Sequence, residues 1–407
     1  MADRVPSPQA TVTALGQQPA HMRSRNASAV LQAIVARGPI SRGEVAAATG
    51  LSAVTVTRVV GTFLATGILM ELTPVAADMG RRRVPLQVVR DDFGVVGVHI
   101  GLRRTSLGLV DLTGSLVARI ELDHTGTSPE EILTQAVDAI PAFIQRVGRS
   151  GSPLGVGVAI GGWVQPQTGT VLWHQALGWK DVPVQEVIAQ GVGLPTWVEN
   201  DVRTMALAEI WMGAGADVRS LIYIFVGNVV GTGIIIDRKL HVGPRSAAGG
   251  MASLEAVGST GNRTASYRPL SDVAVLERAR QSGVEDAASL DALVKLARDG
   301  DRKVHTLLRA RAQRIGNMAA VLVDLLDPEV VVLGGSGVLA APEYLPTVRE
   351  EALRRAPMPF DVQRVLVPTA LGEAGLVIAP ATLVLESLYE QPLESLATIG
   401  RVGGAER

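Results

Sequence analysis

The chain has 407 residues, 47% hydrophobic content, a net charge of −1 and no cysteine. This length predicts two or three domains with sizeable cores. The lack of cysteine excludes disulfides and cysteine-ligated zinc, and it fits a cytoplasmic protein. No membrane-spanning run and no signal-peptide pattern is found, so we expect no membrane partner.

The charge is distributed unevenly between a basic head and an acidic remainder. Residues 1–90 hold ten arginines and four acidic side chains, a balance of +6 that leaves −7 for the rest. A basic segment on an acidic protein is typical of a nucleic-acid contact confined to that segment. Chance charge drift between domains is the alternative. Residues 1–24, rich in Pro, Ala, Gln and Ser, are predicted to be a disordered tail.

Residues 41–67 predict two helices joined by a tight turn, the pattern of a helix-turn-helix. Ser41 and Glu44 have the spacing of a capping box, and Gly50 suits a left-handed C-cap. Ser52 can cap the second helix. Apolar residues at helical spacing would face inward in that helix: Val56, Val59, Val60 and Leu64. We expect the DNA-facing set to be Ser52, Ala53, Thr55, Thr57 and Arg58, because small side chains with one arginine suit a major groove about 12 Å wide.

Flanking segments extend this pattern to a winged domain over residues 25–90. Asn26 can cap a first helix over residues 27–37, and residues 68–73 read as a short strand. A return strand over residues 86–89 would complete a hairpin. Its tip carries three arginines: Arg81, Arg82 and Arg83. They could lie along phosphates or reach into a minor groove. A solvated basic linker is the alternative.

From residue 94 the pattern changes to alternating strands and helices, which implies an α/β body. We find no short internal repeat in it. The strands are predicted over residues 94–102, 105–112, 115–122, 155–160, 220–236 (a pair), 329–333 and 365–368. The helices are predicted over residues 129–147, 201–212, within 271–326, and over 373–389.

Five segments together resemble the ROK family (repressors, open reading frames, kinases). They are residues 51–69, 79–86, 197–209, 327–335 and 371–383. The resemblance implies a winged helix-turn-helix followed by a two-lobed, actin-like sugar-kinase body. Lobe I would cover residues 93–195, completed by the C-terminal helix 373–390, and lobe II residues 196–372.

The resemblance places Asp201 at the position of the family's catalytic base, but other kinase positions differ. His99 stands where the first phosphate loop has aspartate. Gly250 and Ser253 stand where the family has a sugar-binding glutamate and a histidine that serves sugar and zinc. We therefore expect no catalytic residue, no metal and no cofactor. Asp201 would be vestigial, a ligand contact or a helix cap.

The resemblance also suggests a sugar site between the lobes. We expect its contacts at Gln175, Asn200, Asp201 and Trp179, through amide and carboxylate hydrogen bonds and aromatic packing. For a tryptophan, core packing is the alternative. The effector would be a sugar or a sugar phosphate.

These features predict a DNA-binding transcriptional regulator, a repressor of the ROK type, whose partner is a double-stranded DNA operator. It would act as a homodimer or homotetramer, with its kinase activity lost. One alternative is a regulator without a sugar effector, whose body serves dimerisation or partner binding. The other is an ATP-dependent sugar kinase with an appended DNA-binding head.

Overall fold

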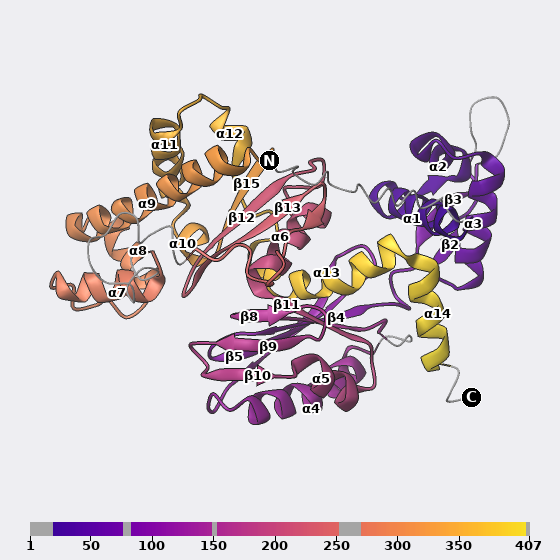
Figure 1. Ribbon diagram of the computed structural model, residues 1–407, viewed down its shortest axis with the longest axis horizontal. Coiled ribbons are helices and arrows are strands. Elements are labelled where there is room, and N and C mark those ends of the chain that lie inside the picture. Colours follow the sequence, from indigo (N-terminus) through magenta and orange to yellow (C-terminus); the bar gives the residue numbers. More distant parts are fainter. Residues whose placement is uncertain (1–18, 76–82, 149–152, 252–269, 404–407) are drawn as a thin grey trace, which may run out of the picture. The chain divides into compact units, whose positions relative to one another are not determined.

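The computed structural model describes residues 19–75, 83–148, 153–251 and 270–403 (Figure 1). The chain forms two compact units. One contains the chain up to Val89 together with Ser387 onward, and the other spans Arg90–Glu386. Within the described ranges, no single helix is long and apolar enough to cross a membrane, and one bent helix pair passes that test by length and composition only.

The head unit contains a helical bundle and a small antiparallel sheet in which β3 lies between β1 and β2. Its N-terminal elements are α1 (Pro19–Arg37), β1 (Ile40–Ser41), α2 (Arg42–Thr49), α3 (Ala53–Ala65), β2 (Leu69–Glu71) and β3 (Pro85–Val88). The predicted helix pair and the two wing strands are confirmed. The buried core includes Val30, Leu31, Ile34, Val45, Val56, Val60, Phe63, Ile68 and Leu86.

The ends of α2 and α3 are held by the predicted caps. The Glu44 N–H donates to the Ser41 side chain, and the Ser41 N–H donates to the Glu44 carboxylate at 2.9 Å, which completes a capping box. Gly50 ends α2 at φ 70°, a left-handed conformation that glycine adopts without strain. Helix α3 then leaves at 117° to α2. These caps set the angle of the helix-turn-helix.

Two expectations for the head were wrong. Helix α1 begins at Pro19, so residues 19–24 are helical and Asn26 lies inside the helix instead of capping it. In α3, Phe63 is fully buried whereas Leu64 is half-buried. The reason is helical phase, because residues 56, 59, 60 and 63 lie on one stripe and residue 64 lies at its margin.

The body contains two five-stranded sheets of the same topology. In each sheet the central strand has two strands on one side that follow in antiparallel pairing. The two strands on its other side run parallel to it. The first sheet has the order β11-β7-β4-β5-β6 and the second β14-β13-β12-β15-β16. The predicted two-lobed α/β body is confirmed, and its lobes are structural repeats that share no short sequence period.

The first lobe is built from β4 (Val95–Ile100), β5 (Arg104–Val110), β6 (Leu116–Asp123), α4 (Pro129–Val147), β7 (Val156–Ile160), β8 (Trp163–Gln165), β9 (Thr170–His174), β10 (Trp179–Val182), α5 (Val184–Val192) and β11 (Thr196–Asn200). Strands β8–β10 form a separate three-stranded sheet. Because β11 pairs in parallel with β7, the first lobe's sheet extends to Asn200, beyond the boundary predicted at residue 195.

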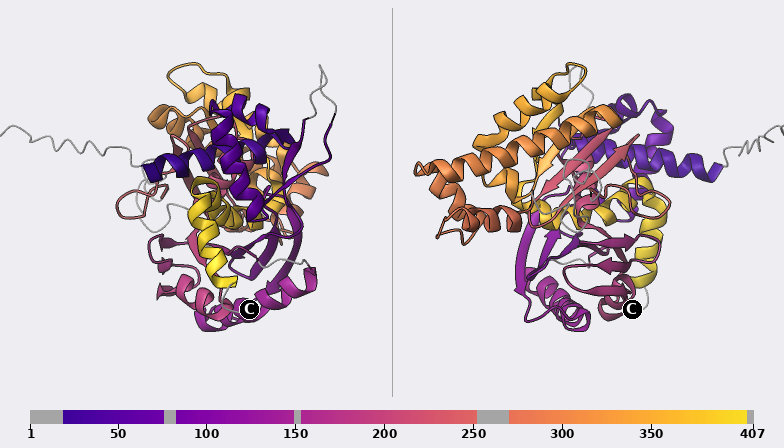
Figure 2. Two further views of the ribbon diagram at one scale, coloured as in Figure 1. Left: turned by 90° about the vertical axis from the view of Figure 1, so that its right-hand side faces the viewer. Right: turned by 60° about the vertical axis from the view of Figure 1, so that its left-hand side comes forward.

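The second lobe begins with α6 (Asp201–Met212), β12 (Leu221–Val226), β13 (Val230–Ile236) and β14 (Lys239–Leu240). After residue 270 it continues with α7 (Asp272–Gln281), α8 (Leu290–Arg298), α9 (Arg302–Leu326), β15 (Val330–Gly334), α10 (Ser336–Leu339), α11 (Leu345–Arg355), α12 (Val362–Val365) and β16 (Leu366–Pro368). Figures 1 and 2 show α7–α11 gathered on one side of the second sheet.

Helix α13 (Gly375–Glu390) is seated on the first sheet by a row of glycines. Gly157, Gly97 and Gly108 are direct cross-strand partners on β7, β4 and β5. A methyl group on any of them would collide with α13, at Val377 or Pro380. The start of α13 therefore packs on the first lobe's sheet.

The end of α13 belongs to the head unit, together with α14 (Pro392–Gly403). Tyr389 is buried there, and the Gln32 side-chain amide of α1 donates to its carbonyl at 3.4 Å. Helix α14 also packs against α1. The DNA-binding head thus includes C-terminal helices that the sequence did not predict for it.

Candidate functional site

Helix α3 presents a small, exposed N-terminal face. Ser52, Ala53, Thr57 and Arg58 are exposed, and Thr55 is half-buried. On the opposite side Val56, Val59, Val60 and Phe63 are buried in the head core. The helix is therefore fixed by its apolar stripe, while the predicted set points outward or lies at the margin. Among the described residues, the Arg58 guanidinium has no hydrogen-bond or ion-pair partner.

The hydroxyls at the start of α3 are already engaged within the protein. The Thr55 N–H donates to the Ser52 hydroxyl at 3.2 Å, and the two hydroxyls are 2.9 Å apart. Sequence reasoning missed Val54, which is 79% exposed beside them. The sequence feature that could have identified Val54 is an apolar residue that lies outside the buried stripe of α3. An exposed apolar side chain there suits contact with a thymine methyl group.

The base of the wing is tied to α2 by two ion pairs. Arg83 lies 3.3 Å from the Glu44 carboxylate, and Arg42 lies 2.7 Å from Glu71 of β2. Hydrogen bonds to Ser41 and the charge of Arg83 lower the pKa of the Glu44 carboxyl, so Glu44 stays an anion and a partner for Arg83. Arg81 and Arg82 lie outside the described residues.

A second group of polar side chains meets at the carboxyl ends of three parallel strands in the first sheet. His99 of β4, Ala159 of β7 and Glu199 of β11 are register partners, so the residues that follow share one edge. Both the His174 imidazole and the Asp201 carboxylate lie next to Gly161. Ligands of open α/β sheets bind at this kind of edge.

Both imidazoles at this edge are held in the neutral form. Burial lowers the pKa of His174 and of His99, and the negative charge of Asp201 opposes that shift in both. The Leu177 N–H donates to Nδ1 of His174 at 3.1 Å, which leaves the proton on Nε2. The site thus combines a carboxylate with neutral imidazoles, which can hydrogen-bond hydroxyl groups.

The structure separates the predicted ligand residues. Asp201 is half-buried at the first turn of α6, with the second oxygen of its carboxylate facing Gly161. Gln175 is exposed. Asn200 is the N-cap of α6, accepts from Val202 and Arg203, and donates to the Gly162 carbonyl at 3.0 Å. Its amide is therefore largely occupied in fixing the helix.

The prediction for Trp179 was wrong. Its side chain is 1% exposed, and the indole N–H donates to the Thr127 carbonyl at 2.7 Å. It pairs with His174 on the inward face of β9–β10, where it fills the first lobe's core. The two tryptophans that do reach the surface are Trp163 and Trp173.

A buried ion pair joins the two lobes beside this site. Glu199 and Arg203 are each 3% exposed, and the guanidinium Nε donates to the carboxylate at 2.8 Å. Arg203 also donates to the carbonyls of Val164 on β8 and Ser246 in the loop after β14. Burial raises the pKa of the Glu199 carboxyl, and the charge of Arg203 opposes that rise. The guanidinium thus bonds the Glu199 carboxylate through two of its nitrogens and also fixes two backbone carbonyls.

The loop that would hold the family's sugar-binding glutamate is attached to β13. The Thr232 N–H and hydroxyl both interact with the Gly249 carbonyl, at 3.1 and 3.0 Å. Gly249 has φ 85° and approaches the Thr232 carbonyl too closely for any side chain. Gly250 follows with no side chain, and Ser253 lies outside the described residues. No cluster of His, Asp or Glu fit to hold a metal is found in the described part of the chain.

The fold and this geometry define a winged helix-turn-helix regulator built on a sugar-kinase-like body. The profile of the ROK family matches residues 95–386. A transcriptional regulator of Mycobacterium tuberculosis (strain ATCC 25618 / H37Rv) is 33% identical over 402 residues, covering 93% of this chain and 89% of that protein. The xylose repressor of Caldicellulosiruptor bescii is 26% identical over 392 residues, covering 91% and 98%.

A solved structure agrees over nearly the whole chain. The crystal structure of a ROK family transcriptional regulator, a homologue of the E. coli MLC protein, has a TM-score of 0.79 and 22% identity, covering 93% of this chain and 100% of that one. The chain belongs to the ROK family, and its winged head places it among that family's transcriptional regulators.

The neutral imidazoles predict that the body gains stability as pH rises from 5.5 to 7.5. Below an unperturbed histidine pKa of about 6.5 the unfolded chain binds protons that folded His174 and His99 do not, so acid favours unfolding. We expect a gain in the free energy of unfolding of at most about 1.4 kcal/mol for each imidazole, measured by urea unfolding at the two pH values.

The variant His174→Gln should reduce this gain, whereas replacement of the exposed His241 by Gln should leave it in place. A free energy of unfolding that is equal at both pH values, or lower at pH 7.5, would contradict the assignment of neutral imidazoles.

Proposed function

We propose that this ROK regulator represses transcription by placing α3 in the major groove of operator DNA. The observation that carries the proposal is the face of α3: Arg58 stands exposed beside small side chains, with no partner for its guanidinium among the described residues, while the buried stripe holds the helix in place. An arginine can donate two hydrogen bonds to guanine, and small neighbours allow close approach to the base edges.

The wing adds contacts that do not depend on base sequence. The head's balance of +6 attracts the phosphate backbone, and Arg83, positioned by Glu44, lies at the base of the hairpin. We assign backbone or minor-groove contacts to Arg81, Arg82 and Arg83. Acting as a homodimer or homotetramer in the cytoplasm, the protein would place two heads in major grooves about 34 Å apart.

We assign the effector site to the edge of the first sheet around Asp201. A carboxylate and neutral imidazoles there match the hydroxyls of a sugar, and exposed Gln175 lies one residue beyond His174. The charge at this edge is negative, which favours a neutral sugar over a sugar phosphate. The relative that is called a xylose repressor supports both repression and a sugar effector. Gly250 in place of glutamate favours the second candidate, a regulator with no sugar effector.

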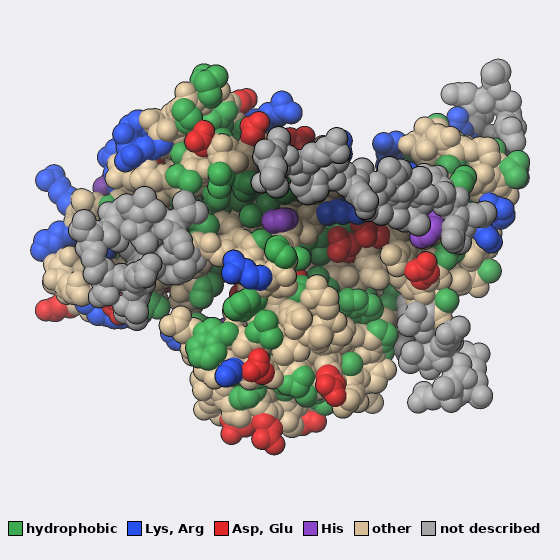
Figure 3. Space-filling model, viewed as in Figure 1, with side chains coloured by type: hydrophobic (Ala, Val, Ile, Leu, Met, Phe, Trp, Pro, Cys, Tyr) green, Lys and Arg blue, Asp and Glu red, His purple; other side chains and the backbone are tan. Residues whose placement is uncertain are grey.

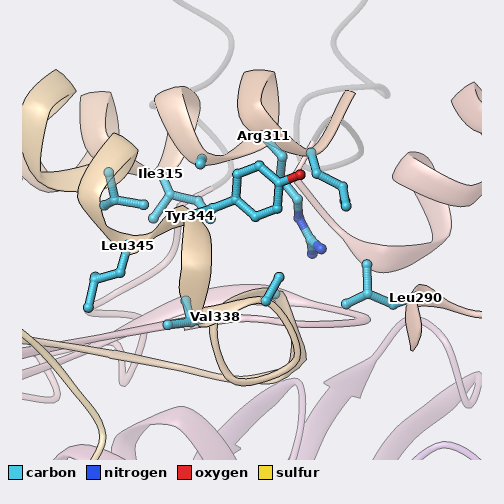
Figure 4. A pocket seen from close by; sticks show the side chains of 11 residues that line it. Leu290, Arg311, Ile315, Val338, Tyr344 and Leu345 are labelled. Carbon is cyan, nitrogen blue, oxygen red and sulfur yellow. The ribbon is translucent and has the colours of Figure 1, made fainter. Parts of the chain in front are cut away.

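Several differences from the kinase pattern support the loss of kinase activity that we propose. His99, a neutral imidazole, replaces the aspartate of the first phosphate loop. On the nucleotide side, the loop after β15 is held from within: the Ser336 hydroxyl donates to Asp272, which pairs with buried Arg311 at 2.6 Å. Figure 4 shows Arg311 of α9 and Val338 of α10 among the side chains that line a pocket beside this segment. The pocket there is lined mainly by apolar side chains, so it offers few partners to a nucleotide.

Replacement of Arg58 by Ala should weaken DNA binding about tenfold to a hundredfold, the loss expected for one arginine–base contact. The measurement is fluorescence anisotropy on duplexes that the wild-type protein selects from a random pool. The matched control is Arg302→Ala, which removes an exposed arginine from the start of α9 in the body. Equal affinities of the Arg58 variant and the wild type would argue against α3 as the recognition helix.

The second test addresses the enzyme alternative. With Mg-ATP and a panel of hexoses and pentoses, a coupled assay should detect no sugar phosphorylation above background, because the phosphate loop lacks its aspartate and the sugar site its glutamate. The Asp201→Asn protein should give the same trace. Turnover by the wild type that disappears in Asp201→Asn would establish a kinase and overturn the loss of activity proposed here.

A further inference from the structure

The outer face of the sheet β8–β10 carries two exposed tryptophans. Trp163 and Trp173 are direct cross-strand partners on β8 and β9, so their side chains share one face. They are 42% and 49% exposed, unusual for so large an apolar side chain. The opposite face is core, with Val164, Val171, Trp179 and Val182 buried in the first lobe. Packing of the sheet therefore does not require these indoles.

A lysine extends the pair into a row across all three strands. Lys180 of β10 is the register partner of Trp173 and is exposed. Neighbouring strands lie about 4.8 Å apart, so the row is a strip with one indole on each of β8 and β9 and a cation on β10. Figure 3 shows apolar and basic side chains side by side over this sheet. We call Trp163, Trp173 and Lys180 the aromatic row.

One ring of the aromatic row is fixed by the second lobe. The Trp163 indole N–H donates to the Arg245 carbonyl at 2.7 Å, which uses its polar edge and leaves the ring otherwise available. The register of β8 and β9 shifts between Trp163 and Val164, an irregularity that re-aims a side chain. Arg245 precedes Ser246, whose carbonyl is held by Arg203. The ring is thus oriented before any ligand arrives.

The row adjoins the proposed effector site along the chain. Gly161 and Gly162 lead directly into Trp163, and His174 directly follows Trp173. Strand alternation places His174 inward, toward Asp201, and the indoles outward. A ligand on the row would therefore contact the same two strands that position His174, next to a loop of the second lobe.

The chemistry of the row favours a carbohydrate. Indole faces pack against the C–H faces of pyranose rings, and a lysine at the end can donate to hydroxyls. The neighbouring residues on these strands, Gln165, Thr170 and Asp181, are polar. These polar neighbours distinguish the row from a membrane- or protein-docking surface, which uses a contiguous apolar patch of several hundred Å².

We propose that Trp163, Trp173 and Lys180 form a binding site for an oligosaccharide of at least two pyranose rings. One ring would stack on each indole. This inference rests on the proposed regulator function and adds an oligosaccharide as a ligand class, bound on the face of the small sheet that points away from Asp201.

The test titrates the full-length protein with glucose, xylose and their α-1,4- and β-1,4-linked di- to tetrasaccharides, followed by tryptophan fluorescence and calorimetry. We expect at least one oligosaccharide to bind at least tenfold more tightly than its monosaccharide. Trp173→Ala should raise that Kd at least tenfold, and Trp173→Tyr, which keeps an aromatic face, should raise it less. Met358→Ala, which removes another exposed apolar side chain, should have no effect.

Binding of no saccharide in the panel would overturn the proposal, as would an unchanged Kd in Trp173→Ala. Thermal unfolding of each variant checks that it is folded, and both exposed positions should tolerate truncation. Affinity for selected DNA without saccharide is measured on the same samples. Failure of the wild-type protein to bind DNA would refute the proposed regulator function. Intact DNA binding with no saccharide binding would refute only the proposed oligosaccharide site on the aromatic row.

Discussion

The arrangement of the body around Asp201 depends on the buried ion pair between Glu199 and Arg203. Two charges removed from water are stable only if their hydrogen-bonding capacity is satisfied inside the protein. Here the guanidinium meets that demand with the Glu199 carboxylate and with carbonyls of Val164 and Ser246, one from each lobe. The same contact brings the Arg245 carbonyl to Trp163. One side chain thereby sets the small sheet, the start of α6 and the loop of the second lobe.

In the proposed function, the body keeps the architecture of a sugar-kinase fold while its chemistry differs. Three parallel strands still end at one edge, and Asp201 still begins the helix that follows them. At that edge β4 carries His99, where the family resemblance implies an aspartate, and after β15 the side chains of Asp272, Arg311 and Ser336 satisfy one another. Such a site can bind a polar ligand without transferring a phosphoryl group. Binding alone is sufficient for a regulator whose output is its affinity for DNA.

The chain passes between the two units twice, before Arg90 and within α13. The glycine row fixes the start of α13 against the first sheet, and Tyr389 at its end bonds to Gln32 of the head. Ligand binding can change the affinity for DNA only if it stabilises one arrangement of the molecule more than another, by a few kcal/mol for a strong response. Helix α13 is one of the two places where the chain continues from the body into the head.

Local rules predicted the elements whose signals are contained within a few residues. The capping box at Ser41 and Glu44 and the bounds of α4 and α6 followed from caps and helical periodicity. Features set by pairing between distant segments were not predictable in this way. Whether Trp173 or Trp179 faces the core depends on the register of β9 with β10, and Asn200 acts as a cap only because β11 ends there. The head's C-terminal helices depend on contacts across almost the whole chain.

The central claim is that α3 places this protein at specific DNA sites. Genome-wide crosslinking of the full-length protein in its own cell, with exonuclease mapping of the bound fragments, tests it most directly. The proposed function predicts discrete sites that share a sequence with two half-sites whose centres lie about one helical turn, or a multiple of it, apart. Crosslinking spread evenly over the genome, with no shared sequence at the strongest positions, would contradict it.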